Sequence, residues 1–421
     1  MKRKEKILIF STMIIMIVGI CTGLFYAYKN KDLKPSQEES QAQTSNTSFD
    51  YDMLKETNKN YKNTNYLISP YSMKIAISMV RDGANGDTRS QIEKMIGNDN
   101  IELLNSKERI STANSLFVKD GYKDRISDSY YDNIKNKYDG EIIYDNFLSP
   151  DAMNKWIYEK TYEMIKDPIK QVDPKMVIGI INALAIDVEW EQQFECSNTY
   201  SVEFRKSNGE KFETEMMHNT YNQKVKYFKT SDESGVILPY RAYDEEGKED
   251  DNGISLEFIG ILPNGDLNNY IENFNEKVLS KIDNNAKEPT DKKELNLALP
   301  RFEYEFNFGA FKDSLINLGM KDAFLPGGAD FSNIAEESEL YISDAIHDTY
   351  IKLGETGTKA AAVTAFIFKE NAVREEKKKV NITFDKPFMY IIRDKKSKNI
   401  LFIGTVYEPN KWEGSTCEKA E

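Results

Sequence analysis

Residues 49–409 carry a pattern of hydrophobic and polar positions that predicts helices mixed with strands, without a fixed repeat. Residues 72–80 are hydrophobic at six of nine positions, which predicts a nearly buried helix that begins at the Ser69-Pro70 pair. Residues 177–185 are hydrophobic apart from one glycine and one asparagine. A run of this length predicts a strand that is buried on both faces.

The remaining segments complete a mixed architecture. Because most of the predicted strands follow residue 175 while the helices cluster earlier, the order is typical of an α+β domain. No linker-like composition interrupts residues 49–409, so we expect one large domain. Further strands are expected at 236–240, 254–262, 295–306, 380–384, 388–393 and 400–407, and helices at 49–57, 128–138, 151–166 and 308–318.

An acidic run, DEEGKEDD at residues 244–251, separates two of the predicted strands. Its six acidic side chains make it a candidate calcium site, but they lack the regular ligand spacing of a calcium loop. Charge runs are most often exposed to solvent. We therefore interpret the run as a solvated hairpin loop.

The N-terminus divides into a hydrophobic segment within residues 1–28 and a polar linker at residues 29–48. Residues 7–28 contain no charge and are long enough to cross a bilayer as one helix, which favours an uncleaved membrane anchor. A cleaved signal peptide and lipidation at Cys21 are the alternatives. All three place the domain at 49–409 and the C-terminal tail at 410–421 outside the cytoplasm, because the positive end of the segment stays inside.

Charge and composition narrow the class of partner. The chain has 421 residues, with 56 Lys and Arg against 69 Asp and Glu, a net charge of −13. Residues 1–28 carry four basic side chains and one acidic one, so residues 29–421 carry −16. This negative charge repels the phosphate backbone and disfavours nucleic acid as a partner. With 40% hydrophobic and 12% aromatic residues, the chain is expected to bury a substantial core.

Metal and cofactor chemistry is not expected. Two histidines, His218 and His347, and three cysteines, Cys21, Cys196 and Cys417, leave few of the usual zinc ligands. With Cys21 in the membrane, only Cys196 and Cys417 remain for a disulfide, and the sequence leaves open whether they pair.

No catalytic signature occurs along the chain. The hydrolase motifs G-x-S-x-G and S-x-x-K, a glycine-rich phosphate loop and the metalloprotease motif H-E-x-x-H are all missing from the sequence. His347 lies among hydrophobic residues, where a histidine is more often a satisfied core residue than a base. We therefore do not expect an enzyme.

The segment GETGTKAAAVTAFIF, residues 354–368, is the most unusual in the chain. Its three alanines permit a short helix, because alanine has the highest helix propensity. As a strand, however, its side chains alternate, and one face is small and uncharged throughout, whereas Lys359 falls on the other face. Such a strand is suited to entering the interior of a sheet. The small face carries Thr358, Ala360, Ala362 and Thr364, and the other face carries Lys359, Ala361, Val363 and Ala365.

This segment resembles the hinge of the reactive-centre loop in the serpin family, and further motifs of the family follow one another in the expected order. By this resemblance the hinge comprises Glu355, Gly357, Thr358, Ala360, Ala361, Ala362 and Thr364, the shutter Ser69, Ser72, Asn182 and His347, and the breach Trp190. Within the shutter we expect His347 to pair with Asn182, near Ser69 and Ser72. The motifs are NYLISPYSMKIAISMVRDGANGDTRSQI at 65–92, IINALAIDVEW at 180–190, LPRF at 299–302, GGADFS at 327–332, DKPFMYIIRD at 385–394 and ILFIGTVYEP at 400–409.

The resemblance implies a serpin fold, with three β-sheets, eight or nine helices and an exposed loop that a protease cleaves. It implies a suicide inhibitor of serine or cysteine proteases, in which the cleaved loop inserts into the large sheet and the protease stays covalently trapped. The alternative is a serpin fold that has lost inhibition and serves as a binding or surface-interaction protein. We expect a monomer that carries out no chemistry of its own and needs no cofactor.

Three departures from the family pattern stand out. Only 22 residues separate Gln91 from Asn114, where a longer helix for polyanion binding is usual, so activation by a heparin-like molecule is not expected. Lys359 replaces the common acidic residue of the hinge. The span from Gly357 to Pro387 is about five residues longer than is typical of the family. The distance over which the protease is carried depends only on the residues that insert before the cleaved bond.

The loop length leaves two candidates for the scissile bond. Seventeen residues counted from Glu355 give the bond Asn371-Ala372, which favours a subtilisin-like or cysteine protease. Counting back from Pro387 gives a position near Glu376 instead, and a trypsin-like protease would cleave the alternative bond Arg374-Glu375. We prefer the forward count, because the residues after the bond act only as a tether.

Overall fold

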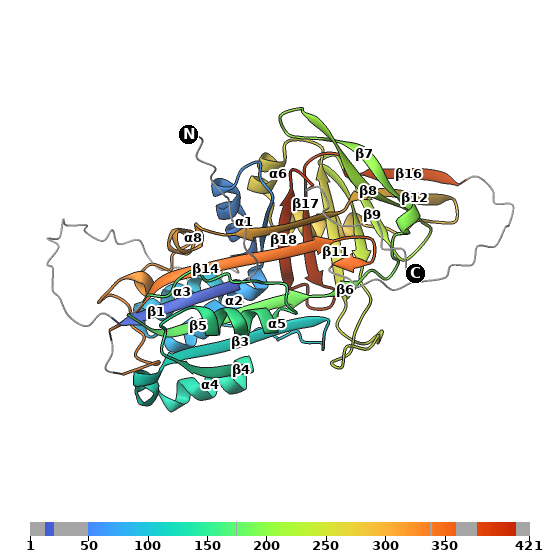
Figure 1. The fold of residues 1–421 in the computed structure, drawn as a ribbon. Helices are drawn as coiled ribbons and strands as arrows, with labels where there is room; N and C mark the ends of the chain where they lie inside the picture. Colours follow the sequence, from blue (N-terminus) through green and yellow to red (C-terminus); the bar gives the residue numbers. More distant parts are fainter. Residues whose placement is uncertain (1–12, 21–48, 174, 337–338, 359–376, 410–421) are drawn as a thin grey trace, which may run out of the picture.

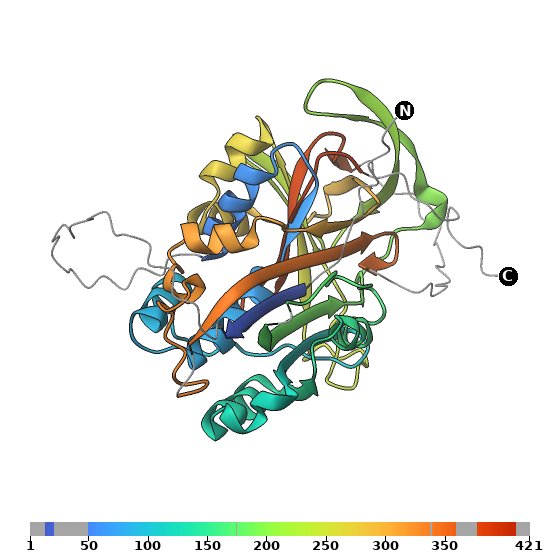
Figure 2. The same ribbon diagram turned by 60° about the vertical axis from the view of Figure 1, so that its left-hand side comes forward.

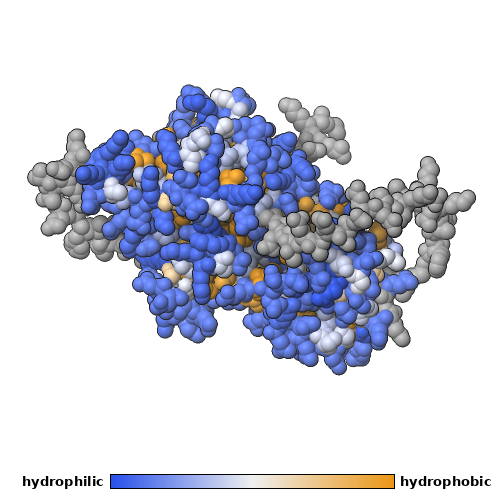
Figure 3. Space-filling view, turned by 180° about the vertical axis from the view of Figure 1, so that it is seen from behind, coloured by the Kyte–Doolittle hydropathy of each residue, from blue (hydrophilic) through white to orange (hydrophobic). Residues whose placement is uncertain are grey.

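The computed structural model describes residues 13–20, 49–173, 175–336, 339–358 and 377–409. Strands of these residues form an eight-stranded, a six-stranded and a four-stranded sheet, and helices lie against the sheets (Figure 1). The expected α+β architecture with three sheets is confirmed. On the face seen in Figure 3, the described side chains are mostly hydrophilic and hydrophobic ones show only in small separate spots.

The described residues contain eight α-helices, and α2 begins as the sequence predicts, because the Ser69 hydroxyl oxygen accepts a hydrogen bond from the Ser72 backbone N–H. The helix expected at 151–166 ends earlier, at Lys160, where the backbone of Tyr162 and Glu163 turns to positive φ. The helices are α1 (Phe49–Asn60), α2 (Pro70–Gly83), α3 (Gly86–Ile96), α4 (Asp128–Tyr138), α5 (Asp151–Lys160), α6 (Leu267–Asn273), α7 (Glu276–Asn285) and α8 (Phe311–Asn317), with 3-10 turns η1 (Asp120–Arg125), η2 (Cys196–Asn198) and η3 (Asp322–Phe324).

The eight-stranded sheet is built around two long strands, β5 (Met176–Ile186) and β14 (Leu340–Leu353). Every residue of β5 is buried, as predicted, because α2 packs against one face of the sheet and α5 against the other. The strands lie in the order β4 (Gly140–Asp145), β3 (Ile110–Lys119), β5, β1 (Met13–Ile20), β14, β15 (Gly357–Thr358) and β6 (Val188–Glu189), and β13 (Phe302–Asn307) pairs with β14.

The other two sheets contain most of the remaining predicted strands. The single strand expected at 295–306 is in fact two strands, which belong to different sheets and meet at Arg301. The acidic run at 244–251 is a loop between two antiparallel strands, as interpreted. The six-stranded order is β2 (Tyr66–Ile68), β18 (Ile400–Val406), β17 (Phe388–Asp394), β11 (Leu256–Pro263), β10 (Glu233–Pro239) and β9 (Lys226–Lys229), and the four-stranded order is β16 (Lys378–Thr383), β12 (Lys293–Pro300), β8 (Lys211–Tyr221) and β7 (Thr199–Arg205).

The N-terminal hydrophobic segment differs from the expectation. Residues 13–20 form a strand, β1, rather than part of a helix, and β1 lies between β5 and β14, antiparallel to both (Figure 2). Five of its eight residues are isoleucine or valine, whose branched side chains favour strands. No helix within the described residues is long and apolar enough to cross a membrane.

Candidate functional site

The hinge enters the large sheet at one end of a slot, which we define as the space between β14 on one side and β5 with β6 on the other. After β14 the chain makes a tight turn, in which the Gly354 N–H donates to the Gly357 carbonyl oxygen at 2.9 Å. The chain then doubles back as β15, so that Thr358 pairs with Leu353 of β14 and with Val188 of β6. The first two residues of the hinge strand are therefore already part of the sheet.

Thr358 points into the protein interior. Its side chain is buried, and its hydroxyl shares a hydrogen bond of 2.6 Å with the hydroxyl of Tyr240. The Tyr240 ring in turn stacks on Trp190, with 4.3 Å between ring centroids and 11° between ring planes. The small face predicted from the alternation therefore begins on the inner side of the sheet.

Trp190 and Glu355 hold the turn that precedes Thr358. The indole N–H of Trp190 donates to the Gly354 carbonyl oxygen at 2.9 Å, and the backbone N–H of Trp190 donates to Thr356 at the same distance. The carboxylate of Glu355 accepts from the Thr199 hydroxyl at 2.8 Å. These contacts join the end of β14 to the residues that follow β6.

A second group of residues completes this support, and the sequence analysis did not identify it. Arg301 is almost completely buried and forms ion pairs with Glu355, at 3.4 Å, and with Glu215. The Phe194 N–H donates to the Glu355 carbonyl oxygen at 2.9 Å. Arg301 lies in the LPRF motif, but its partners come from distant parts of the chain, so no local pattern indicates that it supports Glu355.

Position 357 requires glycine because the backbone of β6 leaves no space there for a side chain. A Cβ atom on this residue would lie 2.1 Å from the carbonyl oxygen of Val188 and 2.7 Å from the Cα of Glu189. Both atoms belong to the backbone of β6 and cannot rotate away. A larger residue at this position would therefore push β15 away from β6.

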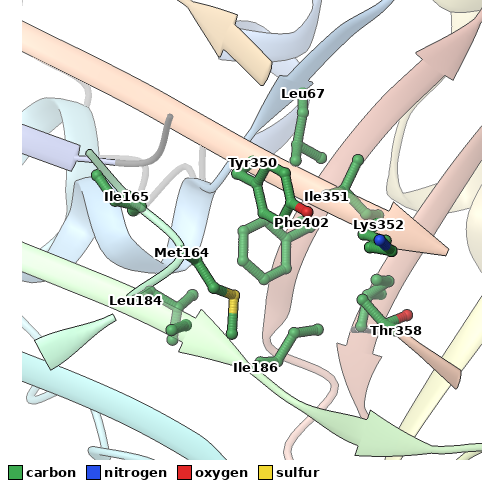
Figure 4. Close-up of a pocket in the computed structure, with 12 residues that line it drawn as sticks. Leu67, Met164, Ile165, Leu184, Ile186, Tyr350, Ile351, Lys352, Thr358 and Phe402 are labelled. Carbon is green, nitrogen blue, oxygen red and sulfur yellow. The ribbon is translucent and has the colours of Figure 1, made fainter. Parts of the chain in front are cut away.

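A small cavity of about 10 Å³, which is enough for one water molecule at most, lies inside the slot directly beyond Thr358 (Figure 4). Its walls come from β5 and β14, from the chain after α5 and from the six-stranded sheet, and most of them are hydrophobic. The residues labelled in Figure 4 are Leu67, Met164, Ile165, Leu184, Ile186, Tyr350, Ile351, Lys352, Thr358 and Phe402.

Farther along the slot, the strand β1 lies between β14 and β5 and pairs with both. Ile14 pairs with His347 of β14 and with Asn182 of β5, and Ile20 pairs with Leu340 at the far end of β14. The slot thus contains the hinge at one end, the cavity next to it, and β1 over the remaining length.

The four residues expected to form the shutter lie in one buried cluster, with a different bonding pattern. The Ser69 N–H donates to Nε2 of His347 at 3.1 Å, and the Ser72 hydroxyl donates to the side-chain oxygen of Asn182. Asn182 and His347 do not bond to each other, although we expected this bond, because β1 lies between their strands and keeps them about 10 Å apart. Asn182 instead donates to Asn114 at 2.8 Å, a partner that the sequence analysis missed.

His347 is a neutral structural residue in this environment. Complete burial lowers its pKa from 6.5 to about 3. Since Nε2 accepts the hydrogen bond from Ser69, the proton of the neutral ring is on Nδ1, which has no hydrogen-bond partner among the described side chains. The ring packs near Phe311. Nothing in this arrangement exposes the imidazole to a substrate.

The rest of the proposed loop lies outside the described residues. This applies to the hinge positions Ala360, Ala361, Ala362 and Thr364, to Lys359, and to both candidate scissile bonds, Asn371-Ala372 and Arg374-Glu375. The described structure resumes at Lys377, directly before the strand β16 at the edge of the four-stranded sheet.

Comparisons with known proteins agree with this arrangement. The family described as serpin (serine protease inhibitor) matches residues 44–409. An uncharacterized serpin-like protein of Thermococcus kodakarensis is 30% identical over 90% of this chain and 88% of its own, and the leukocyte elastase inhibitor of Xenopus laevis is 28% identical over 86% and 98%. The crystal structure of the thermophilic serpin tengpin in its native state matches with a TM-score of 0.71 and 28% identity, covering 89% of this chain and 96% of that one. The chain therefore belongs to the serpin family.

Proposed function

We propose that this chain inhibits serine or cysteine proteases as a suicide substrate. The protease cleaves the loop that follows Thr358 in the chain and stays attached to the cleaved end through an acyl bond. The residues between Thr358 and this end then enter the slot as a new strand and carry the protease with them. The chain itself supplies no catalytic group. It supplies a sheet that becomes more stable when the loop inserts, and a barrier that delays insertion until cleavage. The observation that carries this proposal is the inward-facing Thr358, already paired on both sides of the slot.

The register of Thr358 tells which neighbours each later residue would meet. Each step forward along the loop would be one step back along β14 and along β6 and then β5, because β15 is antiparallel to β14 and to β6, which follows β5 in the chain. At residues 360, 362 and 364 every neighbour on the inner face would be buried, so an unpaired charge at these positions would be costly. The inner positions would be Ala360 between Ile351 and Ile186, Ala362 between Thr349 and Leu184, and Thr364 between His347 and Asn182.

The length of the slot supports the bond Asn371-Ala372. In the same register, residue 370 would lie opposite Met176, where β5 begins, and residue 371 would lie opposite Leu340, where β14 begins. Insertion up to residue 371 therefore uses the whole length of both strands. Cleavage after Arg374 would leave three residues beyond the sheet. The asparagine at 371 and the hydrophobic residues 366–368 before it favour a subtilisin-like or cysteine protease.

Insertion also requires β1 to leave the slot. Residues 13–20 occupy the part of the slot that loop residues 363–371 would need, and the two cannot be there together. We infer that residues 7–28 lie in the cell membrane in the active protein, which empties the slot and leaves the serpin domain outside the cell. Fractionation would test this placement: recovery of a mature chain that starts after residue 28 from the medium would exclude the anchor.

The occupied slot favours one alternative, a serpin fold that does not inhibit and acts by binding. If β1 stays in place, the loop cannot insert and a protease can only cleave it. Polyanion activation remains unsupported in either case, because residues 97–109, between α3 and β3, contain no helix and residues 29–421 carry −16.

The expected result of inhibition is a covalent complex. The full chain in lipid nanodiscs is incubated with a panel of subtilisin-like, trypsin-like and cysteine proteases and examined by SDS gel electrophoresis. We expect a band at the summed mass that boiling does not dissociate, and a released C-terminal fragment that begins at Ala372.

Each protease with its nucleophile replaced by alanine is the matched control, because it binds the loop but forms no acyl bond. A fragment that begins at Glu375 would move the scissile bond to the second candidate. Cleavage of the loop by every protease, with no stable band, would support the non-inhibitory alternative.

A further inference from the structure

Cys196 is disulfide-bonded in the structure, and it lies beside the residues that hold the hinge. It begins the turn η2, two residues after Phe194 and three residues before Thr199. Both of these neighbours donate hydrogen bonds to Glu355, at 2.9 Å and 2.8 Å. A covalent bond at Cys196 thus fixes the segment that supports the first residue of the hinge.

Cys21 is too far away to be the partner. It directly follows Ile20, which pairs with Leu340 at the far end of β14, whereas the hinge pairs with Leu353, thirteen residues along the same strand. At about 3.3 Å per residue, these two ends of β14 are roughly 40 Å apart. The Cα atoms of a disulfide lie within about 7 Å of each other.

Cys417 is the remaining cysteine, and the C-terminal tail is long enough to bring it to Cys196. Glu408 forms an ion pair of 2.8 Å with Lys206, which follows one end of β7, and Cys196 lies just before the other end. The seven residues of β7 span about 23 Å, while the nine residues from Glu408 to Cys417 reach up to about 30 Å. We infer that Cys196 and Cys417 form a disulfide that fastens the C-terminus to the hinge support.

This bond sets a requirement on the compartment. To form the bond, two thiols must lose two protons and two electrons. An external disulfide accepts them by thiol–disulfide exchange and is thereby reduced to two thiols. Such bonds persist in oxidising surroundings and not in the reducing cytosol. The disulfide would therefore form only after the serpin domain has left the cytosol, which makes the full stability of the hinge support dependent on export.

Mass spectrometry of the full chain, digested without reduction in the presence of a thiol-blocking reagent, tests the pairing. We expect one linked pair of peptides, containing Cys196 and Cys417, and one blocked thiol, at Cys21. A linked pair that contains Cys21, or three blocked thiols in protein purified from the cell envelope, would overturn the inference.

Thermal unfolding tests the role of the bond in the hinge support. Because the bond closes a long loop in the unfolded chain, Cys417→Ser should lower the melting temperature by roughly 5 °C, and reductant should have no further effect on this variant. Cys21→Ser, the matched control, should melt like the wild type. Equal melting temperatures for all three proteins would contradict a stabilising disulfide. Neither readout involves a protease, so failure here is distinguishable from failure of the proposed inhibition.

Discussion

Ala362→Arg should convert the inhibitor into a substrate that proteases cleave without being trapped. In the register of Thr358, residue 362 would enter the slot between Thr349 and Leu184, both of which are buried. Burying a guanidinium without a partner costs several kcal/mol. An added barrier of about 3 kcal/mol slows insertion by roughly 150-fold, so that hydrolysis of the acyl bond occurs first.

The measurement is the number of inhibitor molecules consumed for each protease molecule trapped. This number should rise at least tenfold for Ala362→Arg. Lys359→Glu is the matched control, because residue 359 would face the other side of the sheet, between the partly exposed Lys352 and Asp187, and it should behave like the wild type. If an arginine at 362 and a glutamate at 359 had the same effect, the assignment of the two faces would be wrong.

Cleavage of the loop should raise the melting temperature by roughly 20 °C or more. Insertion adds a strand of about thirteen residues between β14 and β5, with hydrogen bonds on both sides. Each net hydrogen bond contributes about 1 kcal/mol, and a domain of this size gains about 2 °C for each kcal/mol. Buried alanine and threonine side chains add to this gain and fill the cavity beyond Thr358.

Calorimetry of the full chain in nanodiscs, before and after cleavage, measures this change. Ala362→Arg serves as the control, because its cleaved form should gain much less. An unchanged melting temperature for the cleaved wild type would show that the loop stays outside the sheet. That is the result expected if β1 keeps its place between β5 and β14.

The parts of the fold that the sequence predicted are those governed by local patterns. The Ser69-Pro70 start of α2, the buried strand β5 and the small face that begins at Thr358 each depend on neighbouring residues and on periodicity. The order of several motifs then indicated the fold, because a series of motifs is far more specific than any one of them.

The parts that could not be predicted depend on contacts between distant residues. Arg301 and Glu215 are 86 positions apart, and nothing in their local sequence marks them as support for Glu355. The segment at 7–28 shows a different limit, because a long hydrophobic run satisfies both a bilayer and the interior of a sheet. Placing β1 in the slot also changed the shutter, where the expected bond between His347 and Asn182 is absent.

Amide hydrogen exchange, followed by mass spectrometry on the full chain in nanodiscs, tests most directly whether the loop becomes a strand of the large sheet. It compares the intact protein with the covalent protease complex. Our account predicts that the amides of residues 359–370 exchange within seconds before cleavage and are protected for hours afterwards, because a central strand opens only when the sheet does. Peptides covering residues 13–20 report whether β1 has left the slot. Rapid exchange of residues 359–370 in the complex, with residues 13–20 still paired between β5 and β14, would contradict the account.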